Sequence, residues 1–165
     1  MVAAVALAEP RGHIISLGSG GTLRYSTESN STRIEIRPSK GAAAKVQILL
    51  PRDETVAPAS PVQSFELLAE KRSGVYILTD RYASRPGPMS YCQSGQEQFV
   101  RVLKRSRALR ETFSLKVQSC RSNLELGPAG LSWDNASSIL TIDGVPPKRY
   151  RIGDDGLVTA VATSY

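Results

Sequence analysis

The stretch that decides the fold is YCQSGQEQFVRVLKRSRALRETFSLKVQSC, residues 91–120. It contains the only two cysteines of the chain, Cys92 and Cys120. Between them, residues 96–103 and 111–118 alternate in polarity with the period of two that is typical of β-strands. A strongly basic turn separates the two runs. The pattern predicts a β-hairpin with a disulfide near its open end.

The cysteine pair also indicates a compartment. Two well-separated cysteines without a C-x-x-C motif are typical of a structural disulfide in a secreted β protein. Closing a loop of this length contributes about 3.5 kcal/mol in the chain-entropy description. The alternative interpretation is two buried thiols that do not pair.

The bulk composition fits one globular domain, which we place at residues 9–165. With 165 residues, 41% of them hydrophobic and 22% charged, the chain is long enough to bury a core. No apolar run approaches the ~20 residues of a membrane-spanning helix, so we expect a soluble domain without a membrane span. The net charge of +6 is spread over the whole chain and favours a protein partner with an acidic surface over nucleic acid.

The first residues predict export. Residues 1–8 are apolar and small, and Ala6-Leu7-Ala8 matches the A-x-A pattern of a signal-peptidase site. They lack a basic n-region, so we interpret them as the remnant of a secretory signal peptide, with the mature chain beginning near Glu9. An apolar strand or an expression leftover is the alternative. Together with the cysteines, this predicts a periplasmic or secreted bacterial protein.

The remainder of the chain alternates short strand candidates with explicit turn residues. Such punctuation, without a convincing amphipathic helix, predicts an all-β fold, an antiparallel sandwich or small barrel of roughly ten short strands. Residues 62–71 also fit one or two helical turns. Outside the hairpin, the strand candidates are residues 13–17, 22–26, 32–37, 45–50, 62–69, 74–82, 123–126, 130–133, 138–143, 148–152 and 157–162.

Catalytic chemistry has few candidates in this sequence. A Ser-His-Asp mechanism needs a histidine, and His13 is the only one, close to the N-terminus. Paired cysteines leave no thiol nucleophile. Glu66, Glu70, Asp80 and Glu97 could meet as a glycosidase pair, yet their spacing gives no evidence that they do. We therefore predict no enzymatic activity.

Metal and cofactor sites are likewise not predicted. A zinc site needs clustered ligands that the sequence does not contain. Asp154-Asp155 and Asp143-Gly144 lack the spacing of a calcium loop and are typical of β-turns. Trp133 could stack on a sugar, but a single tryptophan in a short strand is more typical of the core.

The strongest positional signal is the basic run at the predicted hairpin tip. Arginine presents a planar fork of donors that pairs bidentately with carboxylates, so we expect an exposed finger that enters an acidic cleft. A solvated turn without a partner is the alternative. The predicted partner-binding residues are Arg101, Lys104, Arg105, Arg107 and Arg110.

The motif Tyr91-Cys92-Gln93-Ser94-Gly95 carries a family resemblance. A cysteine followed by x-x-Gly at a strand start, with a later cysteine, resembles the periplasmic lysozyme inhibitors of Gram-negative bacteria. The resemblance covers residues 92–120 and implies a small periplasmic β protein that binds another protein; no inhibitory residue is carried over. We predict an inhibitor or immunity protein against a secreted or cell-wall-directed enzyme. A carbohydrate- or peptidoglycan-binding module, or an anionic-polymer binder, is the alternative.

Overall fold

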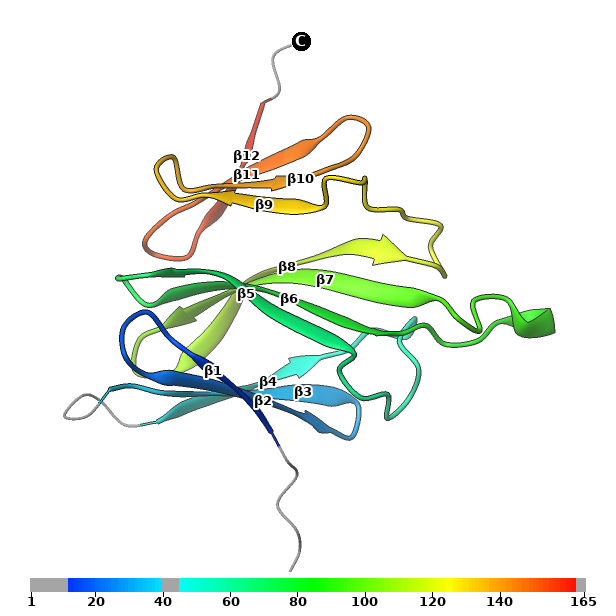
Figure 1. The fold of residues 1–165 in the computed structure, drawn as a ribbon, viewed down its shortest axis with the longest axis horizontal. Helices are drawn as coiled ribbons and strands as arrows, with labels where there is room; N and C mark the ends of the chain where they lie inside the picture. Colours follow the sequence, from blue (N-terminus) through cyan, green and yellow to red (C-terminus); the bar gives the residue numbers. More distant parts are fainter. Residues whose placement is uncertain (1–11, 40–44, 163–165) are drawn as a thin grey trace, which may run out of the picture.

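Three stacked antiparallel sheets make up the molecule (Figure 1). The computed structural model describes residues 12–39 and 45–162, and these contain twelve strands. Each sheet is a meander of four consecutive strands. The all-β prediction is confirmed, but the strands number twelve rather than about ten. They form three open layers instead of a closed barrel.

The layers follow chain order. The N-terminal sheet consists of β1 (His13–Ser16), β2 (Thr22–Glu28), β3 (Ser31–Arg37) and β4 (Val46–Pro51). The central sheet consists of β5 (Ser64–Lys71), β6 (Val75–Ala83), β7 (Gln96–Arg105) and β8 (Leu109–Ser119). The C-terminal sheet consists of β9 (Leu131–Asp134), β10 (Ile139–Ile142), β11 (Lys148–Ile152) and β12 (Val158–Val161).

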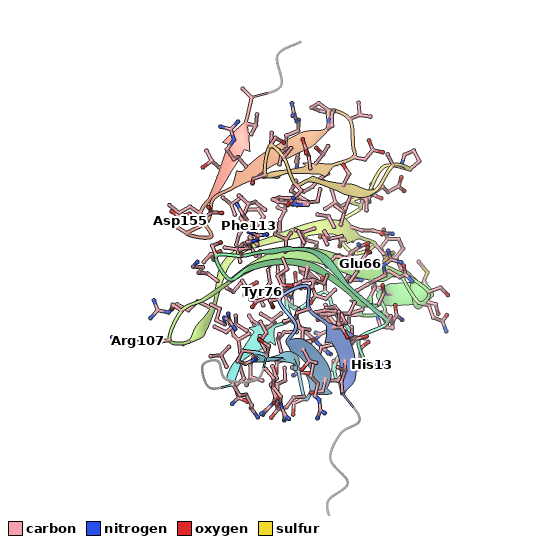
Figure 2. All side chains as sticks on the ribbon, turned by 60° about the vertical axis from the view of Figure 1, so that its left-hand side comes forward. His13, Glu66, Tyr76, Arg107, Phe113 and Asp155 are labelled. Atoms are coloured by element: carbon pink, nitrogen blue, oxygen red, sulfur yellow. A yellow bond between two sulfur atoms is a disulfide. The ribbon has the colours of Figure 1, made fainter. Side chains whose placement is uncertain are left out.

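The central sheet is covered on both faces, and its sequence shows why. β6 begins Val75-Tyr76-Ile77-Leu78, an apolar run without alternation, which is what a strand buried on both sides requires. Successive side chains point to opposite faces, so Tyr76 faces the N-terminal sheet and Ile77 faces the C-terminal sheet. Figure 2 shows Tyr76 in the first of these interfaces and Phe113 of β8 in the second.

Two hydrophobic cores result, one in each interface. The first holds buried side chains of the N-terminal sheet against the central sheet: Leu23, Ile34, Ile36, Leu50, Tyr76, Leu78 and Leu103. The second joins the central and C-terminal sheets through Val75, Ile77, Val100, Val102, Val117, Leu140, Ile142 and Ile152.

The predicted hairpin and its disulfide are confirmed. β7 and β8 pair antiparallel from Glu97 and Ser119 to Arg105 and Leu109. The bond between Cys92 and Cys120 joins their open end, with Cα atoms 5.8 Å apart. The register shifts at two places, which are β-bulges in β8.

Two local predictions need correction. Residues 64–71 form the strand β5, which begins two residues later than predicted, so the helical alternative is wrong. The only helical turn in the described part is η1 (Pro88–Ser90). Residues 123–126 are not a strand. Ser119 and Leu124 form a single bridge in which each amide bonds the other carbonyl, and Asn123 adopts a positive φ of 50° to close that tight turn.

Among the described residues, no helix has the length and apolar character needed to cross a membrane. The suspected signal remnant, residues 1–8, lies outside the described ranges.

Candidate protein-binding surface

The basic run lies where the sequence predicted it, at the turn between β7 and β8. Arg105 is the last residue of β7, and Ser106 donates its amide to the carbonyl of Ala108 across the turn at 3.0 Å. Arg107 and Arg110 are exposed and Arg105 is half-buried. Figure 2 shows Arg107 extending away from the sheets into solvent.

Arg101 is not part of this surface. Its side chain is 2% exposed and lies between the N-terminal and central sheets, where Nε is 2.9 Å from Oδ1 of Asp80. Nη1 donates to Glu111 at 2.9 Å, and Nη2 donates to the carbonyl of Pro51 at 3.2 Å. This burial does not fit the predicted contact between Arg101 and a partner: Arg101 lies on the same face of β7 as Phe99 and Leu103, and that face points into the fold.

Burial and charge shift the pKa values in this interior cluster. Burial alone would lower the pKa of Arg101, but the nearby carboxylates of Asp80 and Glu111 raise it above its ordinary value. Burial and the charge of Asp80 raise the pKa of Tyr82, whose hydroxyl donates to Asp80. The arginine therefore stays a cation and the phenol stays neutral. Burial raises the pKa of Asp80, and the charge and hydrogen bonds of Arg101 oppose that rise. Because Arg101 Nε contacts both oxygens of Asp80, at 2.9 and 3.0 Å, we treat the two as an ion pair inside the fold.

Lys104 supports the tip rather than displaying charge. Its Nζ donates to the carbonyl of Ser73 at 2.6 Å and to that of Asp154 at 2.8 Å. Those contacts fasten β7 to the β5–β6 turn and to the β11–β12 turn. Lys104 could bind a partner only if it gave up these two hydrogen bonds, and its predicted role in binding stays a prediction.

The three remaining predicted arginines are joined by one that the sequence reasoning missed. Arg72 is exposed in the β5–β6 turn, and that turn packs beside the tip, because the amide of Arg105 donates to the carbonyl of Gly74 at 2.8 Å. None of these side chains has an ion pair or a hydrogen bond with another described residue. We call Arg72, Arg105, Arg107 and Arg110 the cationic tip.

The cationic tip is held in place by neighbouring turns and not by the disulfide. The ten residues of β7 separate it from the disulfide by about 30 Å, so the bond cannot fix the turn directly. The Gly74–Arg105 hydrogen bond and the Lys104 contacts do so instead. Gly74 has a positive φ of 83°, which suits glycine and lets the β5–β6 turn close beside β7.

The catalytic candidates each have a structural environment. His13 lies on the edge strand β1 and stacks on Tyr25 with ring centroids 4.9 Å apart. Asp80 is bound by Arg101, and Glu70 accepts a hydrogen bond from Ser19 Oγ at 2.6 Å. Glu66 is exposed on β5 (Figure 2).

Glu97 is the centre of a polar cluster that sequence reasoning missed. It is fully buried, with Ser84 Oγ at 2.7 Å, Thr55 Oγ1 at 2.9 Å and Lys116 Nζ at 3.5 Å. Burial would raise its pKa, but the hydrogen bonds of the surrounding hydroxyls lower the pKa overall. Since Lys116 also pairs with Asp53 at 2.5 Å, these charges satisfy one another. The cluster therefore fits a structural role.

The acidic residues that were considered as calcium ligands stabilise turns through hydrogen bonds to backbone amides. Asp155 accepts the amide of Leu157 at 3.0 Å, and Asp143 accepts that of Ala129 at 2.8 Å. Within residues 12–39 and 45–162, no group of three potential metal ligands comes together. Trp133 packs on the second hydrophobic core, as its sequence context predicted.

Comparison of this chain with known protein families, with characterised proteins and with solved structures finds no match. The resemblance to periplasmic lysozyme inhibitors therefore stays a prediction based on residues 92–120 alone.

Proposed function

We propose that the protein is a non-enzymatic binding domain of the bacterial periplasm that docks its cationic tip into an acidic cleft of a partner protein. In its most concrete form it is an inhibitor or immunity protein against a secreted or cell-wall-directed enzyme. The observation that carries the proposal is the gathering of Arg72, Arg105, Arg107 and Arg110 on two adjacent turns, without a described carboxylate bound to any of them.

The contrast with other cations of the molecule supports this assignment. Arg33 is paired with Glu28 at 2.5 Å, Arg37 with Glu35 at 2.6 Å and Lys71 with Asp154 at 2.7 Å. Other arginines of the described residues, such as Arg24, Arg149 and Arg151, also lack an ion pair, so the contrast lies in the gathering of four unpaired arginines on two adjacent turns. Arg105 and Arg110 lie on opposite faces of the hairpin, because Arg105 pairs with Leu109 and Arg110 with Lys104. The tip therefore presents its cations around the turn, as a finger that enters a cleft would.

The geometry suits a cleft rather than a flat surface. The tip is a short turn at the end of two long strands, and its backbone is held by a neighbouring turn, so little conformational entropy is lost when it docks. Each guanidinium can bind a carboxylate through two parallel hydrogen bonds. Bound in this way, the turn would block the acidic cleft of a glycan-cleaving enzyme, which works with paired carboxylates.

The disulfide supports the proposed compartment. Structural disulfides persist in oxidising compartments such as the periplasm and are rare in the cytosol. The bond between Cys92 and Cys120 fits that setting.

The experiment compares three forms of the chain: the parent, the triple variant Arg105→Ala, Arg107→Ala and Arg110→Ala, and a matched control. The control, Arg24→Ala, Arg149→Ala and Arg151→Ala, removes the same charge from the N-terminal and C-terminal sheets. Binding is measured to a lysozyme and to proteins retained from the periplasm of the source organism. We expect the tip variant to bind its partner at least tenfold more weakly, while the control stays within about threefold of the parent.

Equal binding by the tip variant, with an unchanged melting midpoint, would show that the interface lies elsewhere. Retention of parent and variant alike on insoluble peptidoglycan would favour the carbohydrate-binding alternative. A steep loss of binding with salt, equal for the tip variant and its control, would indicate an anionic polymer bound away from the tip, since counterion release follows the number of polymer charges that the protein neutralises.

A further inference from the structure

The end of the molecule opposite the cationic tip carries a protruding loop. Between β6 and β7 the chain extends outward through η1, at the right of Figure 1. Met89 at its apex is 100% exposed, and Tyr91 is 53% exposed. Large apolar side chains displayed singly are ordinary, but here two stand on one projecting loop.

The loop is preorganised. Gly87 donates its amide to the carbonyl of Tyr91 at 2.7 Å, and Tyr91 donates back to Pro88 at 3.1 Å. Met89, Ser90 and Cys92 all have positive φ angles, between 52° and 62°, which non-glycine residues rarely adopt. Because each such residue costs free energy, the surrounding bonds must over-determine this shape, and the disulfide of Cys92 is one of them.

An apolar pocket lies at the same end. It opens between β8 and the C-terminal sheet, has a volume of about 200 Å³ and is lined by Leu115, Val117, Leu124, Ile142, Val145 and Pro146. Val145 on its rim is fully exposed. A cavity of about 150 Å³ accepts benzene, so this pocket can accept a methionine or tyrosine side chain.

Loop and pocket are neighbours on one surface. Tyr91 and Leu124 line a common hollow beside the disulfide, and Leu124 also lines the apolar pocket. A projection and a recess placed side by side can be exchanged between two copies about a twofold axis, each copy supplying both parts. The pocket is an open border of the second hydrophobic core, since Val117 and Ile142 belong to both, and neither the loop nor the pocket overlaps the cationic tip.

We propose that the protein forms a twofold dimer in which the Met89–Tyr91 loop of each copy fills the apolar pocket of the other. Charge complementarity favours a second copy as the occupant. Exposed Arg85 and Arg121 flank the loop, whereas Glu125 and Asp143 line the pocket. Two lysines, Lys116 and Lys148, also line the pocket. Because Asp53 already neutralises Lys116, the two carboxylates of the lining face one free cation of the described residues, Lys148.

The dimer has a functional consequence. Its interface lies at one end of the central sheet, about 30 Å along β7 from the other end, so both cationic tips stay free. Two tips on one particle raise the effective concentration for a partner that has two acidic sites. The dimer itself does not depend on the proposed function.

Sedimentation velocity of the purified chain, from about 1 to 100 µM, tests the proposal without any other ligand. We expect a species of twice the 17.8 kDa chain mass that dissociates on dilution. The loop variant Met89→Ser and Tyr91→Ser, and the pocket variant Val145→Glu, should each raise the dimer dissociation constant at least tenfold. A matched control, Ile14→Ser and Leu157→Ser, removes exposed apolar groups elsewhere and should leave it unchanged.

Mixing the two variants sharpens the test. A loop-variant copy and a pocket-variant copy retain one intact loop and one intact pocket that face each other, so the mixture should contain more dimer than either variant alone. A parent chain that stays monomeric at about 100 µM overturns the proposal. So does a dimer that neither variant weakens, or one that the control weakens equally.

Discussion

The two faces of the central sheet are built from the same strands by opposite means. On the face toward the N-terminal sheet, Asp80, Tyr82 and Arg101 are buried together with their charges and hydrogen bonds. On the face toward the C-terminal sheet, alternate residues of β6 and β7 such as Ile77 and Val102 pack against aliphatic side chains. The first interface thus adds a buried polar cluster to its hydrophobic core, whereas the core of the second is built from apolar side chains.

The polar face has little tolerance for change in a single partner. Thr32 of β3 lies 2.6 Å from the hydroxyl of Tyr82, the guanidinium of Arg52 lies 4.3 Å above the Tyr82 ring, and Arg101 bonds Pro51 at the end of β4. These contacts cross from the central to the N-terminal sheet at fixed positions. A shift of one sheet over the other would leave buried polar groups unpaired, which costs more than a shift of aliphatic contacts.

The apolar face is fastened only at its border. Lys71 at the end of β5 donates to Ile152 at 2.9 Å and to Ser138 at 3.2 Å, and it pairs with Asp154 at 2.7 Å. Thr112 of β8 donates to the carbonyl of Gly156 at 2.7 Å. The interior between these border contacts depends on packing, so its energetics should follow cavity volume rather than charge.

The largest effect is expected from Arg101→Ala. The change leaves Asp80 buried without its cation, and breaking a buried pair in this way costs about 3–5 kcal/mol of the free energy of unfolding. Denaturation in urea at neutral pH measures the loss. The double variant Asp80→Leu and Arg101→Met should regain most of it, since apolar replacement of a whole buried pair is often neutral. A loss below about 1 kcal/mol for Arg101→Ala would mean that the pair is not specifying the interface.

On the opposite face, Leu140→Ala should cost about 3 kcal/mol. Leu140 of β10 is fully buried against the central sheet, so its truncation removes apolar contact and leaves a cavity. The matched control is Thr159→Ala on the exposed side of β12, for which a change within about 0.5 kcal/mol is expected. If both variants were equally mild, the C-terminal sheet would contribute little to cooperative stability, and the two-interface comparison would fail.

The sequence predicted the elements better than their stacking. A period of two identifies strands and their two faces, and Asp, Gly and Pro mark the turns, so most strand positions and the hairpin were predictable. Nothing in that period says which sheet covers which face, and the three layers were therefore missed. The continuous apolar run of residues 75–78 was the available signal of a strand covered on both sides.

Sequence reasoning likewise placed some residues of the candidate site correctly and missed others. Arg107 and Arg110 were placed correctly because a turn must expose its residues. Arg101 was misplaced because a run of basic residues was treated as continuous, although the alternation had already grouped it with Phe99 and Leu103. Arg72 was missed because only tertiary pairing of β6 with β7 brings its turn beside the tip.

The smallest expected effect is on the pH dependence of the free energy of unfolding, and Glu97 is the residue that tests it. The pKa of Glu97 is lowered in the folded state, so its contribution to stability is present above the unfolded-state value of about 4.3 and is lost as the pH falls through the folded-state value. The pKa values of Asp53 and Glu35 are lowered too, so these carboxylates together should make the free energy of unfolding fall as the pH drops below about 5. The raised pKa of Asp80 acts in the opposite direction and makes that fall smaller.

Glu97→Gln removes this titration and keeps one of the two acceptor oxygens. Ser84 donates to Oε1 and Thr55 to Oε2, so one of these hydroxyls must turn to accept from the new amide group. Stability at pH 7 should therefore drop by only about 1 kcal/mol, and the decline between pH 5 and 3 should become shallower than in the parent. Guanidinium titrations at several pH values measure both quantities, with Glu66→Gln on the exposed part of β5 as the control. If the free energy of unfolding of Glu97→Gln fell as steeply between pH 5 and 3 as that of the parent, the pH dependence would come from the other carboxylates. The buried cluster around Lys116 would then make no contribution to it.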